Sequence, residues 1–411
     1  MNSEVATAYP AGACDLARRA DEHLFGHILP FWCGPALDRE QGGWMAWLWN
    51  DLRPDRSRPK GLVLYSRLLW TFAAAHRSRS ERLFRDMADC ALDWVMNRFW
   101  DPEHGGAFWR LDDTGVVIDS SKQVYGQAFC LYALAEYHRV FDSPAALSRA
   151  KELFVLLERH AHEPGYGGYF EAYARDWSPG DAKSQVGGVE LNARKSMNTN
   201  LHVLEAFTTL YRAWKDPTLA ARLRELIRVF LDKVLDSQTW HFHHFFSESW
   251  KSLSDNYTFG HDIEGSWLLC EAAEVLGDEQ LLREVEAATM RMAEVVSKEG
   301  VAPDGGLLYE GREGKIVDAG KEWWPQAEAV VGFINAWQIS HEPQYLNAAC
   351  RFWDYIEQCI VDRVHGDWFW RINPDGNPDV TKPKVSEWKC PYHSARACLE
   401  TIRRFGTVPA S

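Results

Sequence analysis

The sequence predicts an all-α fold, an (α/α)6 barrel of six helix pairs with short β-hairpin loops at the face that would hold the active site. Three observations predict it. A glycine–aromatic motif recurs along the chain, a largely apolar helix follows each copy, and an amphipathic helix precedes each copy. An open solenoid is the alternative, but six pairs with strongly apolar inner members bury those members best by closing into a ring.

The copies of the motif are spaced almost evenly. The intervals between successive markers are 63, 62, 76, 62 and 61 residues. Two copies run from Trp109 to Gly115 and from Trp370 to Gly376, and both end in turn residues that predict hairpins. The six markers are Gly42, Gly105, Gly167, His243, Gly305 and Gly366.

Two sets of helices are expected around these loops. The outer helices carry charges on one face and are expected near 13–32, 81–99, 144–160, 216–235, 278–297 and 342–361. The inner helices are largely apolar and are expected over 65–77, 125–139, 197–214, 260–275, 323–338 and 391–404. No linker divides the chain, so residues 1–411 are expected to form a single catalytic domain.

Composition excludes several classes of function. The 411 residues carry a formal net charge of −13 without a lysine–arginine run, which argues against nucleic acid or an anionic membrane as a partner. The first twenty residues lack the apolar core of a signal peptide, and no apolar run is long enough to span a membrane. Nine cysteines at irregular spacing fit a reduced, cytoplasmic protein better than a disulfide framework.

The inner helices begin with polar side chains that would meet at one mouth of the barrel. His261 and Glu264 are three residues apart, so they share a helix face and the carboxylate could orient the imidazole as a base. His202 and His393 stand on two other inner helices, and three histidines suggest proton transfer near neutrality. The set therefore predicts a catalytic cavity. Further polar and aromatic groups near these starts are Arg67, Tyr125, Gln127, Asn198, Trp323, Trp324, Glu328, Trp388, Tyr392 and Arg396.

No metal or organic cofactor is predicted. Metal binding is the alternative, since His261 and Glu264 could ligate a cation and His241, His243 and His244 form a cluster. However, the sequence has no His-Glu-x-x-His helix and no Asp-rich set at the predicted mouth, and the histidine cluster lies in a predicted hairpin. Glycine-rich nucleotide-binding loops and a Gly-x-Ser-x-Gly nucleophile elbow are likewise missing from the sequence.

Four ordered motifs resemble the N-acylglucosamine 2-epimerase superfamily, and within it most closely the cellobiose 2-epimerases. The resemblance spans essentially the whole chain, and it implies an (α/α)6 barrel and a cofactor-independent sugar 2-epimerase. The motifs are Lys195-Ser196-Met197-Asn198-Thr199-x-Leu201-His202, Phe259-Gly260-His261-Asp262-Ile263-Glu264, Lys321-Glu322-Trp323-Trp324-Pro325-Gln326-Ala327-Glu328 and Trp388-Lys389-Cys390-Pro391-Tyr392-His393.

The resemblance also implies roles for individual residues. His261 and His393 are similar to the acid/base pair that flanks C2 of the sugar, and His202 to the histidine that helps to open the ring. Glu264 resembles the carboxylate that supports His261. Substrate-binding groups, among them ligands of the sugar oxygens and aromatic platforms for the sugar rings, are expected at Arg67, Tyr125, Asn198, Trp324, Trp388, Trp370 and Glu328.

The chemistry that the resemblance implies starts from an opened sugar ring, in which the C2 hydrogen lies α to an aldehyde. One histidine removes this proton to give a cis-enediol intermediate, and a proton then returns to the other face of C2. The expected substrate is a small sugar, namely the reducing-end glucose or mannose of a β-1,4 disaccharide such as cellobiose or lactose. The protein is expected to be a monomer or a homodimer.

Several alternatives remain open. A monosaccharide 2-epimerase, a mannose isomerase or an N-acylglucosamine 2-epimerase would use the same first step. An (α/α)6 glycoside hydrolase would need two carboxylates, for which Glu264 and Glu328 are candidates, but it leaves three histidines unexplained. A sugar-binding barrel without activity explains the tryptophans only. The sequence also departs from the family pattern at Asn200, where a histidine is expected, and at Ser394-Ala395 after His393.

Overall fold

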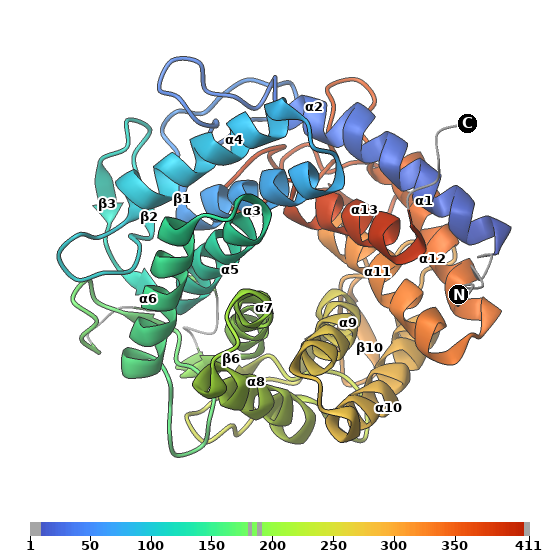
Figure 1. The fold of residues 1–411 in the computed structure, drawn as a ribbon. Helices are drawn as coiled ribbons and strands as arrows, with labels where there is room; N and C mark the ends of the chain where they lie inside the picture. Colours follow the sequence, from blue (N-terminus) through green and yellow to red (C-terminus); the bar gives the residue numbers. More distant parts are fainter. Residues whose placement is uncertain (1–9, 180–182, 187–190, 407–411) are drawn as a thin grey trace, which may run out of the picture.

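Six helix pairs form a closed ring in the computed structural model, which describes residues 10–179, 183–186 and 191–406 (Figure 1). The last inner helix packs against the first, so the predicted (α/α)6 barrel is confirmed. The inner helices are α3 (Leu62–Ser78), α5 (Val124–Phe141), α7 (Met197–Ala213), α9 (Phe259–Leu276), α11 (Trp323–Ser340) and α13 (Tyr392–Phe405). All six lie within three residues of their predicted bounds.

Apolar residues on every side explain why these helices line the centre of the ring. In α5 all residues from Val124 to Tyr137 are buried, which is typical of a core helix. The outer helices bury one face only, as the charged face of each predicts. They are α1 (Ala11–His23) with its continuation α2 (Leu29–Trp32), α4 (Arg82–Asp93), α6 (Pro144–His160), α8 (Pro217–Val229), α10 (Glu279–Val295) and α12 (Pro343–Tyr355).

Short strands join neighbouring repeats. The strand before an inner helix pairs in antiparallel fashion with the strand of the next loop along the chain, as β1 does with β2 and β11 with β12. A bridge between Leu48 and Val385 links the first repeat to the sixth and completes the ring. The strands are β1 (Lys60–Gly61), β2 (Arg110–Leu111), β3 (Val117–Asp119), β4 (Lys122–Gln123), β5 (Ala172–Tyr173), β6 (Lys195–Ser196), β7 (Phe245–Phe246), β8 (Asn256–Thr258), β9 (Glu310–Arg312), β10 (Lys315–Asp318), β11 (Lys321–Glu322) and β12 (Arg371–Ile372).

The fourth residue of an inner helix fastens the glycine–aromatic loop of its own repeat. In α7 this residue is Asn200, which accepts a hydrogen bond from Tyr169 N (2.8 Å) and donates one to Tyr169 O (3.1 Å). Gln127 does the same with Ala107, at 2.8 Å for both bonds. Asn200 and Gln127 are fully buried. The departure from the family pattern at position 200 therefore concerns a residue that holds a loop of the barrel in place.

The fourth repeat has a different register from the predicted one. In the other repeats the first marker glycine has a positive φ and closes a turn, as Gly105 does by donating to Asp101 O. In the fourth repeat this residue is Trp240, with φ +63°, which donates to Asp236 O. The marker is thus Trp240 and not His243. The sequence pattern missed it because a tryptophan stands where the other repeats have glycine.

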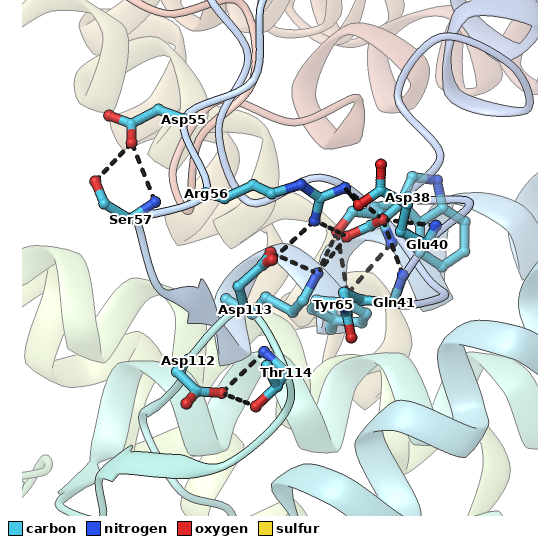
Figure 2. A network of polar contacts seen from close by, with 12 residues as sticks. Asp38, Glu40, Gln41, Asp55, Arg56, Ser57, Tyr65, Asp112, Asp113 and Thr114 are labelled. Carbon is cyan, nitrogen blue, oxygen red and sulfur yellow. Dashed lines mark hydrogen bonds and ion pairs between the residues drawn. The ribbon is translucent and has the colours of Figure 1, made fainter.

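Buried lysines hold several of these loops. Lys60 Nζ lies 3.3 Å from a carboxylate oxygen of Asp38, and both side chains are fully buried. Figure 2 shows how Arg56 joins the same network, with its guanidinium 3.0 Å from Asp38 and 2.8 Å from Asp113. A buried charge is tolerated only when it is paired, so such a network fixes the loop at a defined place on the barrel mouth.

All nine cysteines are free thiols, as the irregular spacing predicted. In the part of the chain that the structure describes, no helix combines the length and the apolar character needed to cross a membrane.

Candidate active site

A cavity of about 400 Å³ opens where the inner helices begin. Ten of the eleven predicted site residues line it, and the exception is Glu328. The ten come from loops and inner helices far apart in the sequence, so the ring itself assembles the site. They are Arg67, Tyr125, Asn198, His202, His261, Glu264, Trp324, Trp370, Trp388 and His393.

His202 is held by a carboxylate on its own helix. Its Nδ1 lies 2.8 Å from Glu205 Oε2, and both residues are buried. A carboxylate can only accept, so Nδ1 carries the proton and Nε2 keeps its lone pair. Burial lowers the pKa of His202 although Glu205 opposes this shift, and a neutral His202 is therefore a base.

His393 has the same arrangement with a carboxylate from another helix. Its Nδ1 lies 2.6 Å from Glu328 Oε1, across the contact between α13 and α11. Burial, and then the charges of Arg67 and Arg396, lower the pKa of His393 well below its usual range. Glu328 has no exposed surface and also accepts a hydrogen bond from Trp267. Contrary to the expectation that it binds substrate, Glu328 thus lies behind His393 and orients that ring.

The predicted pair of His261 and Glu264 does not form. His261 Nδ1 lies 2.5 Å from the hydroxyl of Thr258, the residue that precedes α9, and Glu264 accepts a hydrogen bond of 2.5 Å from Arg396. His261 is in the first turn of the helix, where its ring can reach back to the N-cap side chain. Burial, followed by the neighbouring histidines, lowers the pKa of His261 well below its usual range.

Arg396 is the charged centre beneath the cavity. Its guanidinium donates to Glu264 at 2.5 Å and to Glu328 at 2.7 Å, and it also bonds Glu205 and Tyr392. One guanidinium thus faces three buried carboxylates. Burial and the adjacent charge of Glu328 raise the pKa of Glu264, while the charge of Arg396 opposes this shift.

A second arginine lines the cavity wall. Arg67 donates to the Tyr125 hydroxyl at 2.9 Å and to the backbone oxygen of Trp388 at 3.3 Å. Asn198 also lines the cavity, and its buried Oδ1 has no hydrogen-bond partner among the described residues. An open acceptor of this kind is suited to a ligand hydroxyl.

Tryptophans form the remaining walls. The ring of Trp324 packs against the imidazoles of His261 (4.7 Å between centroids) and His393 (5.6 Å). Trp370 lines the cavity from the hairpin of the sixth repeat, whereas Trp368 of the same hairpin is fully buried. One side chain of this hairpin therefore faces a ligand and the other faces the core.

Several residues of the site were not predicted. Glu205 follows His202 at the same spacing that predicted a pair of Glu264 with His261, so the spacing could have revealed it. The only sequence signal for Thr258 is its position directly before an inner helix. Other lining residues without a prior signal are Gln185, Val186, Tyr309 and Glu322.

Three ligand-type side chains beneath the cavity have the spacing of a cation site. One atom each from Glu264, Glu328 and His393 lie within 4.8 Å of one another. The guanidinium of Arg396 bonds both of these carboxylates, so a positive charge already neutralises them. This arrangement opposes binding of a second cation.

The chain is similar over most of its length to known sugar epimerases. The family described as N-acylglucosamine 2-epimerase (GlcNAc 2-epimerase) matches residues 43–397. Cellobiose 2-epimerase from Bacteroides fragilis is 38% identical over 389 residues, which cover 94% of this chain and 98% of that protein. The enzyme of the same name from Dictyoglomus turgidum is 37% identical, with 93% and 97% covered.

Solved structures show the same relationship. The structure of cellobiose 2-epimerase from Bacillus thermoamylovorans B4167 matches with a TM-score of 0.90 and 37% identity, over 95% of this chain and 99% of that one. The structure of a D-mannose isomerase, at 20% identity and a TM-score of 0.82, shares the fold. The chain belongs to the N-acylglucosamine 2-epimerase family, and it is a carbohydrate epimerase that acts as a sugar 2-epimerase.

Proposed function

We propose that the enzyme interconverts glucose and mannose at the reducing end of β-1,4 disaccharides such as cellobiose and lactose, without a cofactor. The observation that carries the mechanism is the placement of two cavity-lining histidines, His261 and His393, against the same Trp324 ring. They come from α9 and α13, which flank α11, so they approach a bound sugar from different directions. The similarity to cellobiose 2-epimerases supports the disaccharide substrate.

Ring opening comes first in this mechanism. His202, whose proton on Nδ1 is fixed by Glu205, takes the O1 proton with Nε2. As the C1–O5 bond breaks and the C1=O1 bond forms, the same nitrogen gives this proton to O5. The aldehyde that results makes the C2 hydrogen acidic. Arg67 and the open acceptor of Asn198 then hold the sugar oxygens.

Proton transfer at C2 follows. His393 takes the C2 proton, the C–H electrons form the C1=C2 bond, and the carbonyl oxygen becomes an enediol oxygen. Glu328 stabilises the imidazolium that forms, and the charge of Arg67 stabilises the developing negative charge on oxygen. His261 delivers its Nε2 proton to the opposite face of C2 as the C1=O bond re-forms. His261 then regains a proton from solvent while His393 loses its own to solvent, and the reverse reaction exchanges the two roles. Glu264, which lines the cavity, accepts a hydrogen bond from a sugar hydroxyl.

The buried position of Glu328 weighs against a glycoside hydrolase. That reaction needs two carboxyl groups that both reach the scissile bond. Glu264 lines the cavity, but Glu328 lies behind His393, and both are bonded to Arg396. A hydrolase mechanism gives no role to the three histidines that line the cavity, whereas a proton-transfer mechanism uses all three.

Deuterium exchange tests the proposed function. The enzyme is incubated in D2O with cellobiose, lactose, glucose or mannose, and C2 is followed by NMR. We expect a mannose-type reducing end with deuterium at C2, formed faster from the disaccharides. Turnover confined to monosaccharides, or a ketose as the main product, would replace the disaccharide epimerase with a mannose-type enzyme.

The two-histidine assignment is tested on each purified epimer. His261→Asn should exchange the C2 hydrogen of one epimer, His393→Asn that of the other, and neither should complete an epimerisation. A proton-transfer residue contributes about 10²–10⁴-fold, so turnover should fall at least that much. His202→Asn should slow both directions alike. Equal loss of exchange on both epimers in both single variants would mean that one histidine acts alone.

A further inference from the structure

A second cavity, of about 560 Å³, lies in the fourth repeat. It is separate from the sugar site and shares no lining residue with it. Its walls include aromatic rings, imidazoles and carboxylates from the loop that follows α8, from strand β8, from the end of α10 with the turn after it, and from the β9–β10 hairpin. Asp236, Trp240, His241, Tyr257 and Glu299 are among the side chains that line it.

Four of the five other repeats place a lysine at the corresponding position. Two residues before the inner helix, Lys60, Lys122, Lys195 and Lys321 each direct an ammonium group to a carboxylate of their own loop. The distances from Nζ to the carboxylate oxygen are 3.3, 3.0, 3.1 and 2.8 Å. Three of these ammonium groups also lie over an aromatic ring, at about 5 Å from its centroid. The common arrangement is thus an ammonium group between a carboxylate and an aromatic face.

The fourth repeat keeps the carboxylate and has no lysine at this position. Asp236 occupies the position of Asp38 and Asp101 in the loop, but Tyr257 stands where the lysine is expected. The ring of Tyr257 stacks on His241, with 3.6 Å between centroids and 7° between planes. His241 in turn bonds Asp262 at 2.7 Å. Asp236 and Tyr257, which occupy the positions of the carboxylate and the lysine, both line the cavity here.

The charge of the cavity favours a cation. Its lining includes four carboxylates, those of Asp236, Asp255, Glu299 and Glu313, and neither lysine nor arginine among the described residues. His241 and His243 are the lining groups that could offset them. His241 lies beside Asp262 and 3.5 Å from Glu299, and His243 Nε2 lies 3.8 Å from Asp236. A single metal ion fits poorly, because in the described parts of the chain the only cluster of three ligand atoms within 4.8 Å is the one at His393. A larger organic cation can reach carboxylates that are spread along the walls.

We propose that this cavity binds an aliphatic primary amine, whose ammonium group takes the place of the missing lysine beside Asp236 and Glu299. The hydrocarbon part would lie against Trp240 and Tyr257, as a lysine stem lies against aromatic rings in the other repeats. A cavity of this volume accommodates a small organic molecule. The inference concerns binding only, and it stands independently of the proposed sugar chemistry.

Isothermal titration calorimetry with 1,4-diaminobutane tests this proposal, at fixed pH and about 150 mM salt so that diffuse charge attraction is screened. Saturable binding of one diamine per chain is expected. 1,4-Butanediol, which has the same length without charge, should not bind, and MgCl2 should not compete at equal ionic strength. Absence of saturable diamine binding, or equal binding of the diol, would overturn the proposal.

Three variants locate the site. Tyr257→Lys supplies the ammonium group from the chain itself and should abolish binding. Glu299→Gln, at a side chain that is 47% exposed and so tolerant of change, should weaken binding about tenfold or more. Glu279→Gln, on the exposed surface of α10 at 91%, removes the same charge and should leave binding unchanged. If Glu299→Gln and Glu279→Gln bind the diamine as the parent does, the cavity is not the site, whether or not Tyr257→Lys folds.

Discussion

The hydroxyl of Thr258 lies 2.5 Å from His261 Nδ1, whereas the other two histidines of the cavity have a carboxylate at the same ring atom. A carboxylate fixes the proton on Nδ1 and so makes Nε2 a permanent base while the ring is neutral. A hydroxyl can donate or accept, so His261 can present either a lone pair or a proton to the substrate. Thr258 is therefore a positioning residue for His261, which in the proposed mechanism exchanges proton-acceptor and proton-donor roles with His393.

Thr258→Val removes this hydroxyl and keeps the shape of the side chain. We expect kcat to fall about 10–100-fold, with KM little changed, because an outer hydrogen bond orients the ring and not the substrate. Thr258→Ser keeps the hydroxyl and should retain most of the activity. Steady-state kinetics with cellobiose check this, together with C2 exchange on each epimer. Equal losses in the valine and serine variants would show that the methyl group, and not the hydroxyl, matters at this position.

Arg396 should be the most costly single side chain to remove from the site. Arg396→Met leaves Glu205, Glu264 and Glu328 buried without their cation, and removal of one partner from a buried ion pair costs about 3–5 kcal/mol. Denaturant unfolding measures the change. Arg82→Met, at a side chain that is 91% exposed, is the control and should change the free energy of unfolding by about 1 kcal/mol or less. Similar stability of the two variants would contradict the assigned role of Arg396.

The sequence predicted the ring and most of the lining, because periodic apolar helices and their polar starts are local patterns. The sequence could not predict which hydrogen-bond partner each of these side chains has. His202 and His261 are each followed by a glutamate three residues later, yet only His202 bonds its own. Arg396, from a distant helix, donates a hydrogen bond to Glu264, and the N-cap residue Thr258 shares a hydrogen bond with His261. The register of the fourth repeat was missed for a similar reason, since Trp240 occupies a turn position that usually demands glycine.

Chelation should leave the activity intact. Glu264, Glu328 and His393 have the spacing of a cation site, but Arg396 already bonds both carboxylates. Epimerisation of cellobiose is measured after dialysis against EDTA and again after addition of Mg²⁺, Mn²⁺ or Zn²⁺. Loss of activity in the chelator that a divalent ion restores would replace the proton-transfer mechanism with a metal-assisted one.

Trp370→Ala should distinguish disaccharides from monosaccharides. Trp370 lines the cavity from the hairpin of the sixth repeat, where its ring also meets Trp323 edge-on at 4.9 Å between centroids. A platform for the second sugar contributes binding that is the same in the ground state and the transition state, so KM for cellobiose should rise while kcat changes little. The monosaccharide serves as the control within the same variant. An equal effect on both substrate sizes would assign Trp370 to the core.

The buried histidines set the pH dependence of activity and of stability. Burial lowers the pKa of His261 and His393 well below the ordinary value of 6.5, so both rings stay neutral at pH 6.5 and lose their base form only in more acidic solution. The acidic limb of kcat/KM should therefore have its midpoint below pH 6.5.

In the unfolded chain the same histidines take up protons near the ordinary pKa of about 6.5, so acidification favours the unfolded state. The free energy of unfolding should fall between about pH 6.5 and the folded pKa values, by up to about 1.4 kcal/mol per pH unit for each histidine. A kcat/KM midpoint at or above about 6.5, with a flat stability profile, would mean that the imidazoles are charged in the folded enzyme and cannot act as bases.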